Sequence, residues 1–188
     1  MTATSISGPV QVAYERLNGA EPYVIGSLSD GHKLGLAVES GGGSGPVTLG
    51  NLQALEEAGI FGVIDEVHSI SIGGINACAQ MAGQTELALE GYGVMTRDGF
   101  IRKWRVKRVM DMRMLDIFLR GPKGLDVEKI TKSPTPIHVG VSLLTGGLRP
   151  VSVDLSKQDP ENVIDWLMRG AHLGLAAGPA PKDSKGNF

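Results

Sequence analysis

The sequence predicts an α/β domain with three layers, α/β/α, built on a mostly parallel central sheet. Two short apolar segments, at residues 34–39 and 64–70, indicate buried strands, and each leads through a tight turn into a helix-like segment. A repeated order of strand, turn and helix is typical of parallel sheets flanked by helices. The length of 188 residues, with 41% apolar and 20% charged residues, suits one globular domain.

Turn and cap residues mark where the elements begin and end. Gly59 is a typical helix stop, Thr145-Gly146-Gly147 indicates the turn of a β-hairpin, and Asp159-Pro160-Glu161 is a typical helix start. The elements expected are helices at 10–17, 47–60, 73–81 and 163–173, a mostly helical stretch at 86–120, and strands at 34–39, 64–70, 137–144 and 148–155. We assign residues 1–32 to an N-terminal arm and residues 33–188 to the domain, which we expect to be incomplete at its C-terminal end.

The bulk properties exclude several classes of protein. A net charge of −2 gives no footprint for nucleic acid. The sequence shows neither a signal peptide nor an apolar run of about 20 residues that could span a bilayer. The single cysteine, Cys78, is expected to be a small buried residue, because it has no partner for an internal disulfide. These features favour a cytoplasmic protein.

Ser71 is the candidate nucleophile, at the junction between the second strand and its helix. A nucleophile elbow, G-x-S-x-G, needs small residues two before and two after the serine, because the backbone turns sharply there. Gly73 meets the second requirement, and Ser69 meets the first as the next smallest choice. The amide of Ile72, at the start of the helix, would face the negative charge that develops during reaction. The alternative is that Ser71 only caps the helix.

The glycine run Gly41-Gly42-Gly43 directly follows the first strand. Consecutive glycines let successive amides point to one place with no side chain in the way, as an oxyanion hole requires. Parallel connectivity would put this turn and the Ser71 turn on the same edge of the sheet. Two separate features therefore indicate one acyl-transfer site.

These glycines do not match the common phosphate-binding patterns. The dinucleotide pattern G-x-G-x-x-G fails at its last position, whether it is counted from Gly41 or from Gly43. The P-loop pattern fails because Asn51 and Leu52 stand where a lysine and a hydroxyl residue must contact phosphate and magnesium. Nucleotide binding is therefore disfavoured, and no cofactor is implied.

Several stretches resemble bacterial members of the patatin-like phospholipase family. They are Ser40 to Gly43, Leu49 to Ile60, Ser69 to Ala77, Gly99 to Arg102, Gly124 to Ile130, Ile137 to Gly146 and Trp166 to Arg169. The likeness covers most of the chain from about Lys33 onward. It implies a lipid acyl hydrolase of phospholipase A or esterase type that forms a covalent acyl-serine. In that family the nucleophile, here Ser71, works with an aspartate as a Ser-Asp dyad.

The chain departs from that family's pattern in three places. Gly43 is followed by Ser44-Gly45-Pro46, without the arginine that usually comes next. Ser69 replaces the glycine two before the nucleophile. The dyad aspartate belongs to an Asp-Gly-Gly or Asp-Gly-Ala motif that this sequence lacks, and Asp183 better matches the turn before it. A serine without a base is a poor nucleophile, so we expect little esterase activity from the chain as given.

Two other functions stay open at this level. An α/β-hydrolase triad needs the order Ser, Asp, His, which Ser71, Asp154 and His172 supply. A non-catalytic protein of the same fold would bind acyl chains or a partner instead. The four histidines show no metal-binding spacing along the chain, so no metal site is expected.

A basic stretch with interleaved apolar residues lies near the middle of the chain. Its charged and aromatic members are Arg102, Lys103, Trp104, Arg105, Lys107 and Arg108. Such a stretch is suited to rest on an anionic membrane surface and feed lipid to the site. A solvated helix face is the alternative, and the one that the pattern favours.

Overall fold

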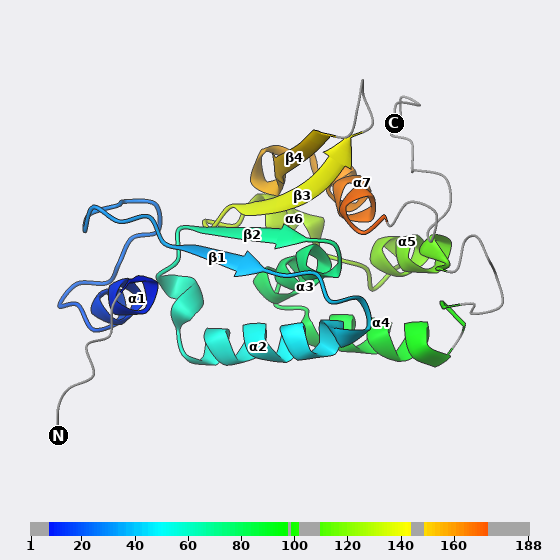
Figure 1. Ribbon diagram of the computed structural model, residues 1–188, viewed down its shortest axis with the longest axis horizontal. Coiled ribbons are helices and arrows are strands. Elements are labelled where there is room, and N and C mark those ends of the chain that lie inside the picture. The colour runs from blue at the N-terminus through cyan, green and yellow to red at the C-terminus, as the bar shows by residue number, and fades with distance from the viewer. Residues whose placement is uncertain (1–7, 98, 102–109, 144–148, 173–188) are drawn as a thin grey trace.

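The structure confirms the predicted α/β class with a mostly parallel sheet. It is a computed structural model that describes residues 8–97, 99–101, 110–143 and 149–172 (Figure 1). The strands are β1 (Gly35–Val38), β2 (Glu66–Ile70), β3 (Ile137–Leu143) and β4 (Arg149–Asp154). The α-helices are α1 (Pro9–Leu17), α2 (Gly45–Glu57), α3 (Ile72–Met81), α4 (Thr85–Arg97), α5 (Met112–Arg120), α6 (Val127–Thr131) and α7 (Pro160–Gly170).

The four strands lie in the order of the sequence, β1-β2-β3-β4. The first three are parallel, and β4 returns antiparallel beside β3, which confirms the predicted hairpin. Val38 pairs with Ser69 across β1 and β2, so these two strands end side by side. The turns that follow β1 and β2 therefore share one edge of the sheet.

Helices α3 and α7 pack directly against one face of this sheet, and α2, α4 and α5 pack against these two. Val67 and Val139 point to that face and are fully buried, while the alternate residues His68 and Ile70 are exposed. Figure 1 shows α2, α3, α4 and α5 together on one side of the strands. The expected second helical layer is not seen among the described residues, so the described structure has two layers.

The stretch at 86–120 is mostly helical among its described residues, as expected, with α4 and α5 joined through a segment in which Ile101 and Met110 form an isolated bridge. The short helix α6 was not expected, and Asp126 caps it by accepting a hydrogen bond from the amide of Lys129. Cys78 is fully buried, as expected, and burial raises the pKa of its thiol. None of the described helices is long and apolar enough to cross a membrane.

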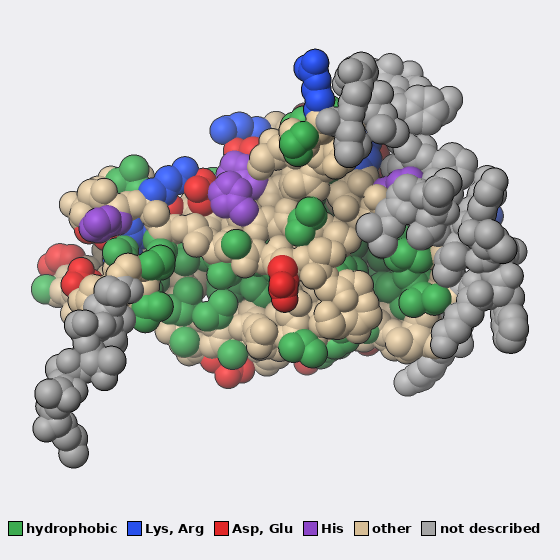
Figure 2. All heavy atoms as spheres, viewed as in Figure 1, with side chains coloured by type: hydrophobic (Ala, Val, Ile, Leu, Met, Phe, Trp, Pro, Cys, Tyr) green, Lys and Arg blue, Asp and Glu red, His purple; other side chains and the backbone are tan. Residues whose placement is uncertain are grey.

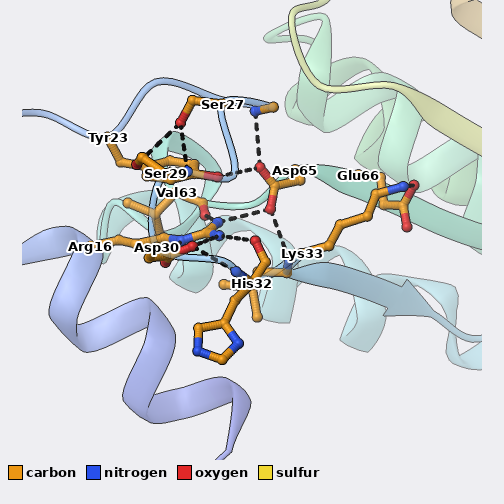
Figure 3. Close-up of polar contacts among 12 residues, drawn as sticks. Arg16, Tyr23, Ser27, Ser29, Asp30, His32, Lys33, Val63, Asp65 and Glu66 are labelled. Atoms are coloured by element: carbon orange, nitrogen blue, oxygen red, sulfur yellow. Dashed lines mark hydrogen bonds and ion pairs between the residues drawn. The ribbon is translucent and has the colours of Figure 1, made fainter.

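Arg16 fastens the described part of the N-terminal arm to the sheet. It lies on α1, and its side chain is only 2% exposed. Its guanidinium donates to both carboxylate oxygens of Asp30, at 2.7 and 3.0 Å. It also donates to the carbonyls of Val63 and His32, each at 2.7 Å, and to Asp65 at 2.9 Å. All five guanidinium donors are thereby used, as burial of a cation requires (Figure 3).

Asp65 completes the same cluster from the residue before β2. One carboxylate oxygen accepts from the Tyr23 hydroxyl at 2.7 Å and the Gly26 amide at 2.9 Å. The other accepts from Arg16 and from the Leu34 amide at 2.8 Å. Burial raises the pKa of Asp65, but these hydrogen bonds outweigh burial and lower the pKa to about 2. The carboxylate thus ties the arm to the segments that enter β1 and β2.

Removing the Asp65 carboxylate should destabilise the fold strongly. Asp65→Ala removes one of the two carboxylates that face buried Arg16 and leaves the Leu34 amide without its acceptor, so we expect a loss of about 3 kcal/mol in the free energy of unfolding. The matched control is Asp116→Ala, which breaks an exposed ion pair with Arg120 and should cost less than about 1 kcal/mol. Urea unfolding followed by circular dichroism measures both. Equal losses would contradict the structural role of Asp65.

The same carboxylate should set part of the acid sensitivity. A folded-state pKa of about 2 lies below the value of about 3.9 in an unfolded chain, so ionised Asp65 stabilises the fold above about pH 4. That stabilisation is lost as the pH falls from about 4 to about 2. Asp65→Asn should therefore flatten the dependence of unfolding free energy on pH in this window. A slope identical to that of the unsubstituted protein would count against this assignment.

Candidate functional site

Ser71 forms the turn between β2 and α3 by itself. Ile70 is the last residue of β2, and Ile72 is the first of α3. The Ser71 backbone has φ 55° and ψ −132°, a conformation that residues with a side chain rarely adopt. Such strain costs about 1 to 3 kcal/mol and persists only where the surrounding structure enforces it. The turn is therefore as sharp as the elbow pattern predicts.

The Ser71 hydroxyl makes no capping hydrogen bond to α3, so the alternative that Ser71 only caps the helix is wrong. The residue as a whole is 8% exposed. Some described side-chain atoms are buried from solvent and have no hydrogen bond. The Oγ atom of Ser71 does not belong to this group. A narrow opening to solvent and a hydroxyl that is not used by the helix leave Ser71 available for chemistry.

The two small residues flanking Ser71 have separate structural reasons. A β-carbon on Gly73 would overlap the carbonyl oxygens of Val38 and Glu39, so only glycine lets α3 begin against the end of β1. Ser69 points to the buried face, and its hydroxyl donates to the carbonyl of His138 at 2.9 Å. Ser69, which takes the place of the first glycine of the elbow pattern, is accommodated because its hydroxyl forms this hydrogen bond between β2 and β3.

The glycine run forms a short 3₁₀ turn, Gly42–Ser44, directly after β1. The amides of Ser44 and Gly45 bond to the carbonyls of Gly41 and Gly42, so they are used inside the turn. The amides of Gly42 and Gly43 precede these and have no such partner within the turn. Gly42 has φ 48°, which glycine adopts freely. The turn therefore offers two neighbouring donors at the edge where Ser71 lies.

Asn76 joins the two turns. It is fully buried on α3, and its side-chain amide donates to the carbonyl of Gly45 at 2.9 Å. Its oxygen accepts from the Tyr92 hydroxyl at 2.7 Å. Burial raises the pKa of Tyr92 to about 12, more than the bond to Asn76 lowers it, so the hydroxyl keeps its proton. A β-carbon on Gly45 would overlap that hydroxyl. The residues that follow the glycine run thus fix it to the elbow helix.

The alternative triad is not assembled around Ser71. Asp154 pairs with His138, which in turn pairs with His68, three residues before Ser71. Three residues along a strand and two strand spacings separate the backbones of Ser71 and Asp154 by roughly 14 Å. The Asp154 carboxylate instead accepts from Ser156.

Two predictions fall outside the part of the chain that the structure describes. These are the proposed role of the basic stretch at 102–108 and the position of Asp183. A cavity of about 810 Å³ is found on the helical side, between the start of α4, the loop after α5 and the start of α7. Its lining includes Glu86, Arg120 and Lys123 but no residue of the elbow or of the glycine turn. The cavity is therefore separate from Ser71.

Comparison with known proteins assigns no family. No model of a known protein family matches the chain, and neither a curated protein nor a solved structure gives a significant match. Function must therefore be argued from the geometry at the shared edge of β1 and β2.

The strain at Ser71 predicts an unusual order of stability. Ser71→Gly removes the cost of the positive φ, whereas Ser71→Ala keeps it. We expect the glycine variant to be the more stable by about 1 kcal/mol, against the usual preference for alanine. Urea unfolding of the two variants measures the difference. An alanine variant as stable as the glycine variant would show that the turn is relaxed.

Proposed function

We propose that this protein is a lipid acyl hydrolase that resembles patatin-like phospholipases and uses Ser71 as its nucleophile. The observation that carries the proposal is the strained Ser71 at the edge shared with the glycine turn. A strained, non-capping serine and a turn with free amides are the two parts that acyl transfer needs next to each other. Asn76, which bonds the elbow helix to the residue after the glycine turn, supports a preformed site.

The reaction follows from these positions. Ser71 Oγ attacks the carbonyl carbon of an acyl ester, and the amides of Gly42, Gly43 and Ile72 stabilise the oxyanion, with Gly41 shaping the turn. Each well-placed donor is worth roughly 3 to 4 kcal/mol of barrier. The bond to the alcohol then breaks, and water releases the acyl group from the serine. The Ser71 proton goes to a carboxylate base, the role that the resemblance gives to the dyad aspartate.

The finer fold is part of the same proposal. Strands in a parallel sheet are usually covered on both faces, because βαβ connections place helices there. The exposed Ile70 and Ala37 lie on the face that the described helices leave open. A second layer over this face would complete the three-layer arrangement.

A non-catalytic protein that binds acyl chains or a partner is the second candidate. This candidate is favoured because the described residues show no hydrogen bond from the Ser71 hydroxyl to a carboxylate or a histidine. Without such a base, a serine hydroxyl reacts slowly. The two candidates share the fold and differ in whether Ser71 is activated.

A fluorophosphonate probe separates these two functions. We expect the probe to label Ser71 slowly, at a site located by peptide mass spectrometry, because the oxyanion amides stabilise attack at phosphorus as they do at carbon even where the chain as given lacks the dyad base. The label should disappear in Ser71→Ala and persist in Ser29→Ala, a control in an exposed segment. Absence of labelling in the unsubstituted chain would reject the hydrolase and favour the binding protein.

A further inference from the structure

Glu66, His68 and His138 bring their side chains together on the exposed face of the sheet. Glu66 and His68 are two residues apart on β2, so they point to the same face. His138 is the neighbour of His68 in the register of β2 and β3. One possible ligand atom from each residue lies within 4.8 Å of those of the other two. Figure 2 shows histidine side chains beside acidic and basic ones on the upper side of the molecule.

The donor atoms of the two histidines converge on the Glu66 carboxylate. His68 Nε2 lies 3.1 Å from Oε1, and His138 Nε2 lies 3.7 Å from Oε2. A tetrahedral ion with bonds of about 2.0 to 2.2 Å holds its ligand atoms about 3.3 Å apart. The two distances from Nε2 to the carboxylate lie on either side of this ligand spacing. The side chains are 18%, 48% and 19% exposed for Glu66, His68 and His138, so they have room to adjust.

The arrangement of the two imidazole rings and the carboxylate suits a bound cation. The imidazole rings stack with their centroids 4.6 Å apart and an interplanar angle of 10°. A metal ion would take one lone pair from each imidazole and would be balanced by the Glu66 carboxylate.

We propose that Glu66, His68 and His138 bind one Zn²⁺ ion on the exposed face of the sheet. Two imidazoles and a carboxylate are a common ligand set for zinc, with water in the remaining position. Asp154, the register partner of His138 on β4, adds negative charge beside the site. The zinc site does not involve Ser71, so the failure of one of the two proposals would leave the other unaffected.

Lys33 competes with the metal for Glu66. Its ammonium group lies 2.6 Å from Glu66 Oε2, and Figure 3 shows the lysine side chain extending from the start of β1 to the carboxylate. Zinc binding must displace this contact and overcome the repulsion of the lysine charge. The Lys33 side chain is 57% exposed, so replacing it should disturb the fold little. Lys33→Met should therefore bind zinc more tightly than the unsubstituted chain.

Isothermal titration of the full chain with ZnCl₂ near neutral pH tests the site. We expect one zinc ion per chain at this cluster. His68→Ala and Glu66→Gln should each raise the Kd at least about tenfold, since loss of a ligand costs no less than loss of a residue that supports one. His32→Ala, a histidine outside the cluster, should leave the Kd unchanged. Lys33→Met should lower it.

A second signal shows whether the histidines are the ligands. Zinc should shift the imidazole NMR resonances of His68 and His138 and leave that of His32 in place, and circular dichroism checks that each variant is folded. No zinc binding by the folded unsubstituted chain would overturn the proposal. Binding that survives both His68→Ala and Glu66→Gln unchanged would overturn it equally, because the ion would then lie elsewhere.

Discussion

The contact between the start of α3 and the end of β1 is the constraint on which the candidate site depends. Gly73 lies against the carbonyls of Val38 and Glu39, and this fit holds Ser71 in its strained turn beside the glycine run. A single β-carbon would separate the two turns. The bond from Asn76 to Gly45 then prevents the glycine turn from relaxing away. The cost of about 1 to 3 kcal/mol at Ser71 is offset by burial around it.

Strong polar interactions and the candidate site occupy opposite ends of the sheet. Arg16 and Asp65 bond to each other and to the surrounding segments where β1 and β2 begin, whereas Ser71 and the glycine turn lie where those strands end. Ligands usually bind at the carboxyl ends of parallel strands, where helix N-termini supply free amides. The amides of Gly42 and Gly43 at the carboxyl end have no partner within their turn, as an oxyanion site requires.

Local patterns predicted most of the fold and the elbow, but not the interactions between distant segments. Ser71, Gly73 and the glycine run lie within turns of a few residues, so spacing along the chain reveals them. The sequence places Arg16 in an N-terminal arm without revealing its contact with the sheet, because its partner Asp65 lies 49 residues away. The pairing of His68 with His138 depends on strand register, which the sequence does not contain. The only local hint was Glu66-Val67-His68, two polar residues on one side of a strand.

The open face of the sheet links the two proposals. Ile70 and His68 share that face, so a helical layer that covers the apolar residue would also approach the histidine cluster. Such a layer would lower the local dielectric and strengthen each ligand's attraction to a cation. It would also make the Lys33 charge harder to displace unless the lysine turned outward. A zinc ion bound before the face is covered would neutralise Glu66 and so ease its burial, because an uncompensated carboxylate is costly to enclose.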